Sequence, residues 1–175
     1  ISSQTMKSLQ SINFKNKKAL IRVDFNVPLN AQFQVTDSTR IVSAKPTIMK
    51  VLEDGGSCVL MSHLGRPESK ESAFSLKHIV RTLETVLGVE VLFSSSCIGE
   101  DAQKFCDNLK PGQILLLENL RYHSDETRGS ENFAKELSKL GDFYINDAFG
   151  TAHRAHASTT IIAKFFPENR CLAAC

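Results

Sequence analysis

Four separate apolar runs in this chain each end in a short polar cluster that contains arginine. Short, continuous apolar runs are typical of strands that are buried on both faces of a parallel sheet. Parallel strands end at a common edge of their sheet, and such sheets bind ligands there. Several guanidinium groups at one edge would form a site for a small, multiply anionic ligand. The four runs with their polar ends span residues 18–28, 57–67, 114–123 and 143–156.

Amphipathic helical patterns alternate with the apolar runs along the chain. Strand and helix repeat about five times, which predicts a doubly wound α/β sheet. Right-handed crossovers would bring the carboxyl ends of all strands to one side of that sheet. Since the chain has no internal repeat or linker, residues 1–175 are predicted to form a single domain.

Start and stop signals bound the predicted helices. Ser75 and Ser130 are each placed to cap the beginning of a helix, and Gly88 is placed to end one. After the first strand, residues 37–39 are placed to cap a helical piece at residues 40–42, and Pro46 is expected to begin a second piece, because proline is favoured at the first position of a helix.

Composition and charge exclude some classes of partner. The chain has 21 Lys and Arg residues against 19 Asp and Glu residues, a formal net charge of +2. It therefore lacks a general positive field for nucleic acid or a membrane surface. No apolar stretch approaches the roughly 20 residues that a membrane span needs. Residues 1–13 lack the pattern of a secretory signal, which favours a cytoplasmic protein.

Five cysteines are an odd number, and no two of them form a C-x-x-C pair. We therefore expect small buried hydrophobes in a reducing compartment, without disulfide bonds. Residue 1 is isoleucine instead of an initiator methionine, and residues 168–175 read like an unfinished helix or core segment. Both features are expected of a fragment of a longer protein.

The segment 62–67 carries the sharpest local signal. Gly65 would let the backbone approach a ligand closely, and Pro67 fixes the exit of the turn, which leaves His63 and Arg66 facing the same space. The alternative is an ordinary turn between strand and helix with a solvated arginine. That alternative weakens because three comparable turns occur along the chain.

Two further clusters each allow two interpretations. Asp24 and Asn26 share one side of a strand, where they can hold hydroxyl groups, although Asp24 can equally be an ion-pair partner that aligns the arginines. Arg121 is either a ligand contact or the partner of Glu118. The two roles of Asp24 are compatible with each other.

The segment 150–158 combines a glycine, small residues and three basic groups, His153, Arg154 and His156. Two histidines three residues apart can suit a metal on a helix, but no carboxylate or cysteine ligand is near, so an anion-binding loop is the better interpretation. The sequence contains neither G-x-x-x-x-G-K-[ST] nor G-x-G-x-x-G, and therefore no recognisable nucleotide cradle.

Four blocks of this sequence resemble phosphoglycerate kinase, in that family's order and at similar spacing. The resemblance covers nearly the whole chain and corresponds to the family's N-terminal domain. The family's C-terminal domain, which carries the glycine-rich nucleotide contacts, is missing from this chain. The blocks are residues 22–28, 62–67, 116–123 and 146–156.

This resemblance implies a Rossmann-like parallel sheet of six strands with helices on both faces, which binds 3-phosphoglycerate at its carboxyl edge. It implies that Asp24 and Asn26 contact the glycerate hydroxyl and neighbouring oxygens. The resemblance implies that Arg40 is the catalytic residue, which faces the glycerate carboxylate and the transferred phosphoryl group. The sequence pattern alone predicts a solvated helix residue at this position. The non-transferring phosphate would be held by His63, Arg66, Arg121 and Arg154.

The family's reaction moves a phosphoryl group reversibly between ATP and the carboxylate of 3-phosphoglycerate, in glycolysis and gluconeogenesis. The resemblance implies that the C-terminal domain binds Mg-ATP or ADP, that this chain holds no metal ligand, and that the full enzyme is a monomer. Two hypotheses remain. The chain is the acid-substrate half of the enzyme, as the four blocks favour, or a non-catalytic module that binds a phosphorylated acid through its arginines, as the absent nucleotide motif favours.

Overall fold

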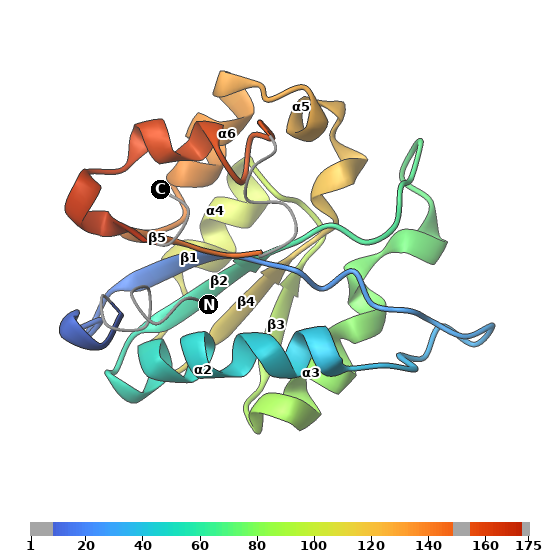
Figure 1. Cartoon of the computed structure of the whole chain (residues 1–175), viewed down its shortest axis with the longest axis horizontal. Coiled ribbons are helices and arrows are strands. Elements are labelled where there is room, and N and C mark those ends of the chain that lie inside the picture. The colour runs from blue at the N-terminus through green and yellow to red at the C-terminus, as the bar shows by residue number, and fades with distance from the viewer. Residues whose placement is uncertain (1–8, 149–154, 173–175) are drawn as a thin grey trace.

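The computed structural model describes residues 9–148 and 155–172, and these form one six-stranded parallel sheet with helices on both faces (Figure 1). The order of strands across the sheet is β3-β4-β2-β1-β5-β6, and every pair of neighbours is parallel. The predicted doubly wound α/β fold is therefore confirmed. The strands are β1 (Lys18–Val23), β2 (Ser57–Met61), β3 (Val91–Ser94), β4 (Ile114–Leu117), β5 (Phe143–Asp147) and β6 (Cys171–Leu172).

In the described residues, five α-helices and several short 3₁₀ turns connect these strands. The α-helices are α2 (Thr39–Glu53), α3 (Val80–Leu87), α4 (Glu100–Asp107), α5 (Ser124–Thr127) and α6 (Glu131–Ser138). The 3₁₀ turns are η1 (Ser72–Phe74), η2 (Leu76–Ile79), η3 (Leu120–Tyr122), η5 (Ile161–Phe165) and η6 (Glu168–Arg170).

The predicted helix signals at Ser75, Ser130 and Gly88 are confirmed. The Ser75 hydroxyl accepts a hydrogen bond from the Lys77 amide at 3.2 Å, at the start of the η2–α3 segment. Ser130 accepts one from the Phe133 amide at 3.3 Å at the start of α6. Gly88 follows α3 in the left-handed conformation, with φ of 72°, where a side chain would be strained.

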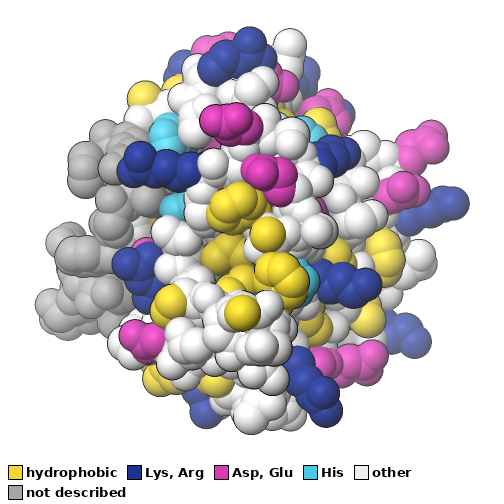
Figure 2. Space-filling view, turned by 90° about the vertical axis from the view of Figure 1, so that its right-hand side faces the viewer, with side chains coloured by type: hydrophobic (Ala, Val, Ile, Leu, Met, Phe, Trp, Pro, Cys, Tyr) yellow, Lys and Arg dark blue, Asp and Glu magenta, His cyan; other side chains and the backbone are white. Residues whose placement is uncertain are grey.

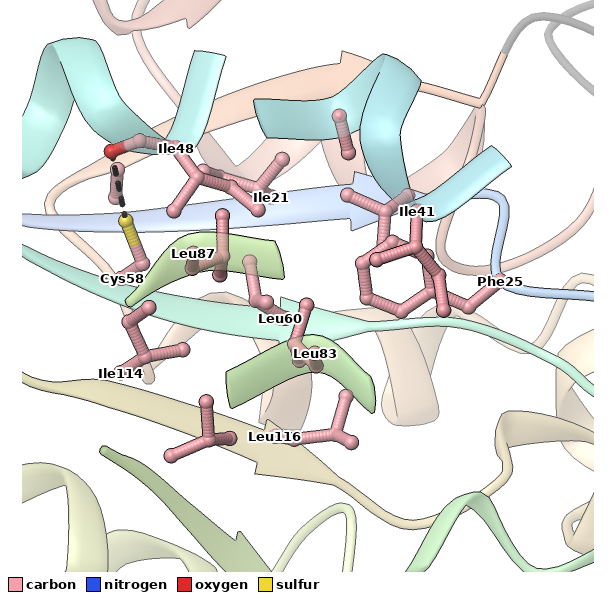
Figure 3. Close-up of a cluster of buried hydrophobic side chains, with 14 of the residues drawn as sticks. Ile21, Phe25, Ile41, Ile48, Cys58, Leu60, Leu83, Leu87, Ile114 and Leu116 are labelled. Carbon is pink, nitrogen blue, oxygen red and sulfur yellow. Dashed lines mark hydrogen bonds between the residues drawn. The ribbon is translucent and has the colours of Figure 1, made fainter. Parts of the chain in front are cut away.

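The two faces of the sheet carry separate hydrophobic clusters, because alternate strand residues point to opposite sides. On one face Ile21, Leu60 and Leu116 pack with residues of α2 and α3, such as Ile48 and Leu83 (Figure 3). On the other face, strand residues offset by one position pack against α4, α6 and η5. The chain runs from β1 through β2 to β3 along the first face and returns through β4 to β5 along the second, as right-handed crossovers require.

One helix prediction is wrong. Residues 39–53 form a single helix with Pro46 inside it, instead of a helical piece at 40–42 and a second one that begins at Pro46. Proline removes the hydrogen bond to the carbonyl of residue 42. Val42 and Pro46 both lie on the exposed side of the helix, where water can replace that bond, so the buried side continues through Ile41 and Ile48.

The cysteine prediction is confirmed for three residues and wrong for one. Cys58, Cys97 and Cys106 are free and buried. Burial raises the pKa of each of these thiols, so they remain protonated and act as small hydrophobes. Cys171 is disulfide-bonded. Among the helices of the described ranges, none combines the length and the hydropathy that a membrane span requires.

Candidate functional site

The segments that follow β1, β2 and β4 meet at the carboxyl edge of the sheet, because β2 lies between β4 and β1. Their polar residues are therefore neighbours, as the sequence predicts. Figure 2, which faces this edge, shows Lys or Arg side chains beside His side chains. Of the predicted residues, Asp24, Asn26, Arg40, His63, Arg66 and Arg121 lie in the described part of the chain. Arg154 lies outside the described residues.

Arg66 and Arg121 line one open pocket of about 610 Å³. Arg66 is exposed, Arg121 is half-buried, and Arg121 Nη1 donates to the Gly65 carbonyl at 3.3 Å. His156, from the segment after β5, lines the same pocket. A planar guanidinium binds phosphate or carboxylate oxygens in a forked geometry, so two of them at one pocket suit a multiply charged anion. The remaining lining residues are Pro67, Glu68, Tyr122, Ser124 and Thr127.

Asn119 joins the two segments that carry these arginines. It is fully buried, and its Nδ2 donates to the carbonyls of Leu64 and Phe74, each at 2.8 Å. Its Oδ1 accepts from the Arg121 amide at 3.0 Å. Both amide hydrogens and the oxygen of this side chain are therefore used to fix the β2 and β4 turns relative to each other.

Glu118 holds the next helical segment at the same edge. Its carboxylate accepts from the Ser75 hydroxyl at 2.7 Å and from the Leu76 amide at 2.8 Å. It also accepts from the Asn119 amide at 2.9 Å. A negative charge at the beginning of a helix is favourable. Glu118 thus anchors the η2–α3 segment, and the role of Arg121 as a ligand contact stays a prediction.

Gly65 sits where a side chain would clash with a neighbour. Its φ is 63°, and a Cβ at this position would lie 2.4 Å from the ring of Phe74. Its amide donates to Asn26 Oδ1 at 2.9 Å. The close approach of Gly65 therefore ties the β2 turn, which carries Arg66, to the β1 turn.

A second polar cluster lies beyond the end of β1. Arg40 Nη1 lies 3.1 Å from Asp24 Oδ1 and 3.0 Å from the Asn26 carbonyl oxygen. The Arg40 side chain is 52% exposed, so it reaches out from α2 into solvent at this edge. The ion-pair role of Asp24 is the one observed, and contact with a substrate hydroxyl stays a prediction.

His63 lies between the pocket and the second cluster. It is almost completely buried, and burial lowers its pKa to about 3, with further lowering by the positive charges of Arg22, Arg121, His156 and Arg40. The imidazole is therefore neutral near pH 7. It belongs to the site as a hydrogen-bonding group and not, in the absence of ligand, as the positive charge that a basic pocket would suggest.

Beneath His63 lies a polar network that sequence reasoning missed. Arg22 is completely buried, and its Nε donates to the Ser158 hydroxyl at 2.9 Å. That hydroxyl donates to the carboxylate of Glu126, which is also completely buried and accepts from the Ser158 amide at 2.8 Å. Glu126 stands among polar residues in the sequence and gives no local sign of burial, so only its distant partners identify it.

Comparison with known proteins agrees with this arrangement. The family described as "Phosphoglycerate kinase" matches residues 9–173. A phosphoglycerate kinase of Porphyromonas gingivalis is 46% identical over an alignment 185 residues long, which covers 93% of this chain and 44% of the relative. One from Chlorobium phaeovibrioides is 48% identical over 162 residues, or 92% of this chain and 41% of the relative.

Solved structures give the same result. The phosphoglycerate kinase of Pyrococcus horikoshii superimposes with a TM-score of 0.81 at 32% identity, over 91% of this chain and 40% of that one. The phosphoglycerate kinase of Coxiella burnetii superimposes with a TM-score of 0.78 at 36% identity, over 89% of this chain and 38% of that one. The chain thus spans about 40% of the length of the relatives that it matches.

Proposed function

Because this chain belongs to the phosphoglycerate kinase family, we propose that it is the 3-phosphoglycerate-binding half of an enzyme that transfers a phosphoryl group reversibly between ATP and 3-phosphoglycerate. The observation that carries this proposal is the pocket at the carboxyl edge, where Arg66 and Arg121 come together from two different strands. A carboxylate with a phosphate group is a small anion of the kind that two guanidinium groups bind.

In this proposal, the two polar clusters contact different parts of the substrate. His63, Arg66 and Arg121 hold the non-transferring phosphate, with Arg154 as a fourth contact. Asp24 and Asn26 contact the hydroxyl and neighbouring oxygens of the glycerate. Arg40 faces the carboxylate, which its exposed position at the edge supports.

Phosphoryl transfer of this type needs positioning and charge stabilisation more than covalent catalysis by the protein. The substrate carboxylate is the nucleophile, so no side chain of this chain needs to be one. Arg40, which we propose as the catalytic residue, stabilises the negative charge of the transferred group. The buried hydrogen bonds of Asn119 keep the arginines in place, so that little of the binding energy is lost in ordering them.

The nucleotide, with its Mg²⁺, is a second substrate in this proposal, and a second domain of the whole enzyme binds it. Residues 9–148 and 155–172 contain no group of three or more His, Cys, Asp or Glu residues placed to hold a metal ion. We also propose a cytoplasmic location, which the three free, buried cysteines favour and the disulfide bond of Cys171 disfavours, and a monomeric whole enzyme.

A coupled assay of ATP-dependent turnover tests the proposal against the alternative of a non-catalytic binding module. Residues 1–175 alone are expected to show no turnover, because half of a site forfeits most of the roughly 7–11 kcal/mol that positioning two reactants can supply. Adding a separately expressed nucleotide-binding half of a family member is expected to give turnover that Arg40→Ala abolishes. Binding of 3-phosphoglycerate without turnover in the combined sample would favour the binding module.

A further inference from the structure

A completely buried arginine contacts the one histidine that lies between the two clusters of the site. Arg22 Nη2 is 3.0 Å from His63 Nδ1, and Arg22 has no exposed surface. We infer that Arg22 is a positioning residue that holds His63 in the tautomer with its proton on Nε2, so that the contact of His63 with the phosphate, which the family resemblance implies, is a hydrogen bond donated by this N–H. The role of Arg22 rests on geometry alone, whereas the role toward the anion rests on the proposed function.

The tautomer follows from the chemistry of the two groups. A guanidinium has only hydrogen-bond donors, so the nitrogen that faces it must accept. His63 Nδ1 is therefore unprotonated, and a neutral imidazole with an unprotonated Nδ1 carries its hydrogen on Nε2. The buried position and the surrounding cations keep the ring neutral, since both lower the pKa of His63.

Arg22 itself is fixed from several sides. Nε donates to the Ser158 hydroxyl, which in turn donates to the buried carboxylate of Glu126. Nη1 donates to the Val23 carbonyl. Burial lowers the pKa of Arg22, and the charge of Glu126 opposes that effect. The guanidinium keeps its proton because arginine is not deprotonated in proteins. An arginine held in this way cannot turn outward to meet a ligand, which separates it from the pocket arginines.

His63 therefore offers the ligand a hydrogen-bond donor that carries no charge. Within the described residues, Nε2 of His63 makes no hydrogen bond, and besides Arg22, which contacts Nδ1, the residues Arg121, His156 and Arg40 act electrostatically on the ring. In the other tautomer, Nε2 would present a lone pair to the lone pairs of a phosphate oxygen, which is repulsive. By fixing the tautomer, Arg22 makes the ring a donor at every pH at which it is neutral.

Nuclear magnetic resonance of the chain with ¹⁵N-labelled histidine tests the tautomer directly, without any ligand or variant. Long-range ¹H–¹⁵N correlation distinguishes a protonated ring nitrogen from an unprotonated one. At pH 7 we expect His63 to show a protonated Nε2 and an unprotonated Nδ1. A protonated Nδ1, or a mixture of tautomers like that of a free imidazole, would overturn the assignment.

Variants separate positioning from mere stability. Arg22→Met removes the donor and is expected to leave His63 as a mixture of tautomers, whereas Arg22→Lys, which can still donate one hydrogen bond, is expected to retain the Nε2–H form. The control is Tyr144→Phe, which removes a buried hydrogen bond to the Ser158 carbonyl without touching His63. It should leave the tautomer unchanged even where it lowers stability. A mixed tautomer in the control but not in Arg22→Met would contradict a specific role for Arg22.

Titration with 3-phosphoglycerate tests the second half of the inference. We expect the His63 Nε2 resonance to shift with saturation while Nδ1 stays unprotonated. His63→Phe, which keeps a ring but has no donor, is expected to weaken binding about tenfold, the equivalent of one neutral hydrogen bond of about 1.4 kcal/mol. Failure of any binding would refute the proposed function and, with it, the donor role, and leave the tautomer assignment intact. Binding that leaves Nε2 unshifted would refute the donor role alone.

Discussion

Substitution of Glu126 by glutamine probes the buried network that supports the site. The change keeps the size and shape of the side chain and removes its negative charge. In the native protein, that charge stabilises the buried guanidinium of Arg22 through the Ser158 hydroxyl that lies between them. Glu126→Gln therefore leaves a positive charge in the interior without its counter-charge.

The structure sets the size of the expected effect. Glu126 and Arg22 are both completely buried, so water cannot replace either one as a partner. Removing one partner of a buried charged pair costs about 3–5 kcal/mol. For a chain of 175 residues, each kcal/mol changes the melting temperature by roughly 2–4 °C, which gives a decrease of about 6–20 °C.

Thermal and urea denaturation followed by circular dichroism measures this effect. The matched control is Glu131→Gln, the same substitution in an exposed pair: Glu131 is 67% exposed and lies 2.9 Å from Lys164 Nζ. That control is expected to cost at most about 1 kcal/mol. Equal losses in the two variants, or a loss below about 1 kcal/mol for Glu126→Gln, would refute the view that this network carries a buried charge.

Three further predictions follow from the same structure. The pKa of His63 is about 3 in the folded state, against an ordinary 6.5, so between pH 7 and pH 5 the unfolded chain takes up a proton at this residue and the native state does not. The free energy of unfolding should therefore fall by about 2 kcal/mol over this range. Urea titrations of His63→Asn should lack that part of the fall. Gly65→Ala should cost about 2–4 kcal/mol by denaturation and weaken anion binding, since it adds left-handed strain to a clash with Phe74, whereas Gly112→Ala adds strain without a clash and should cost less. Ser130→Ala should lower stability by about 1 kcal/mol through loss of the α6 cap, and unchanged melting would contradict the cap's role.

The parallel sheet and the polar cluster at its carboxyl edge could be predicted because short apolar runs and their polar ends are local signals. Residues 57–61 and 114–117 are apolar or small throughout and completely or almost completely buried, and the turns after them carry Arg66 and Arg121 to one pocket, as predicted. The helix interruption at Pro46 was wrong for a physical reason: a proline on the exposed side of a helix loses only a bond that water can replace.

The network beneath the site could not be predicted, because it depends on contacts between residues far apart in the sequence. Glu126 and Ser158 are 32 positions apart, and Arg22 and Ser158 are 136 apart. A polar residue that will be buried looks the same in the sequence as one that will be solvated. The neutral state of His63 was missed for the same reason, since its surroundings come from four different segments.

Calorimetric titration of the chain with 3-phosphoglycerate tests the central claim most directly. The account predicts saturable binding that Arg66→Ala and Arg121→Ala each weaken by about ten- to a hundredfold, because each removes a charged hydrogen bond of about 1.5–3 kcal/mol. Arg81→Ala, which removes an exposed arginine on α3, is expected to leave the affinity unchanged. No saturable binding by the native chain, or equal affinity in both pocket variants and the native chain, would contradict the account.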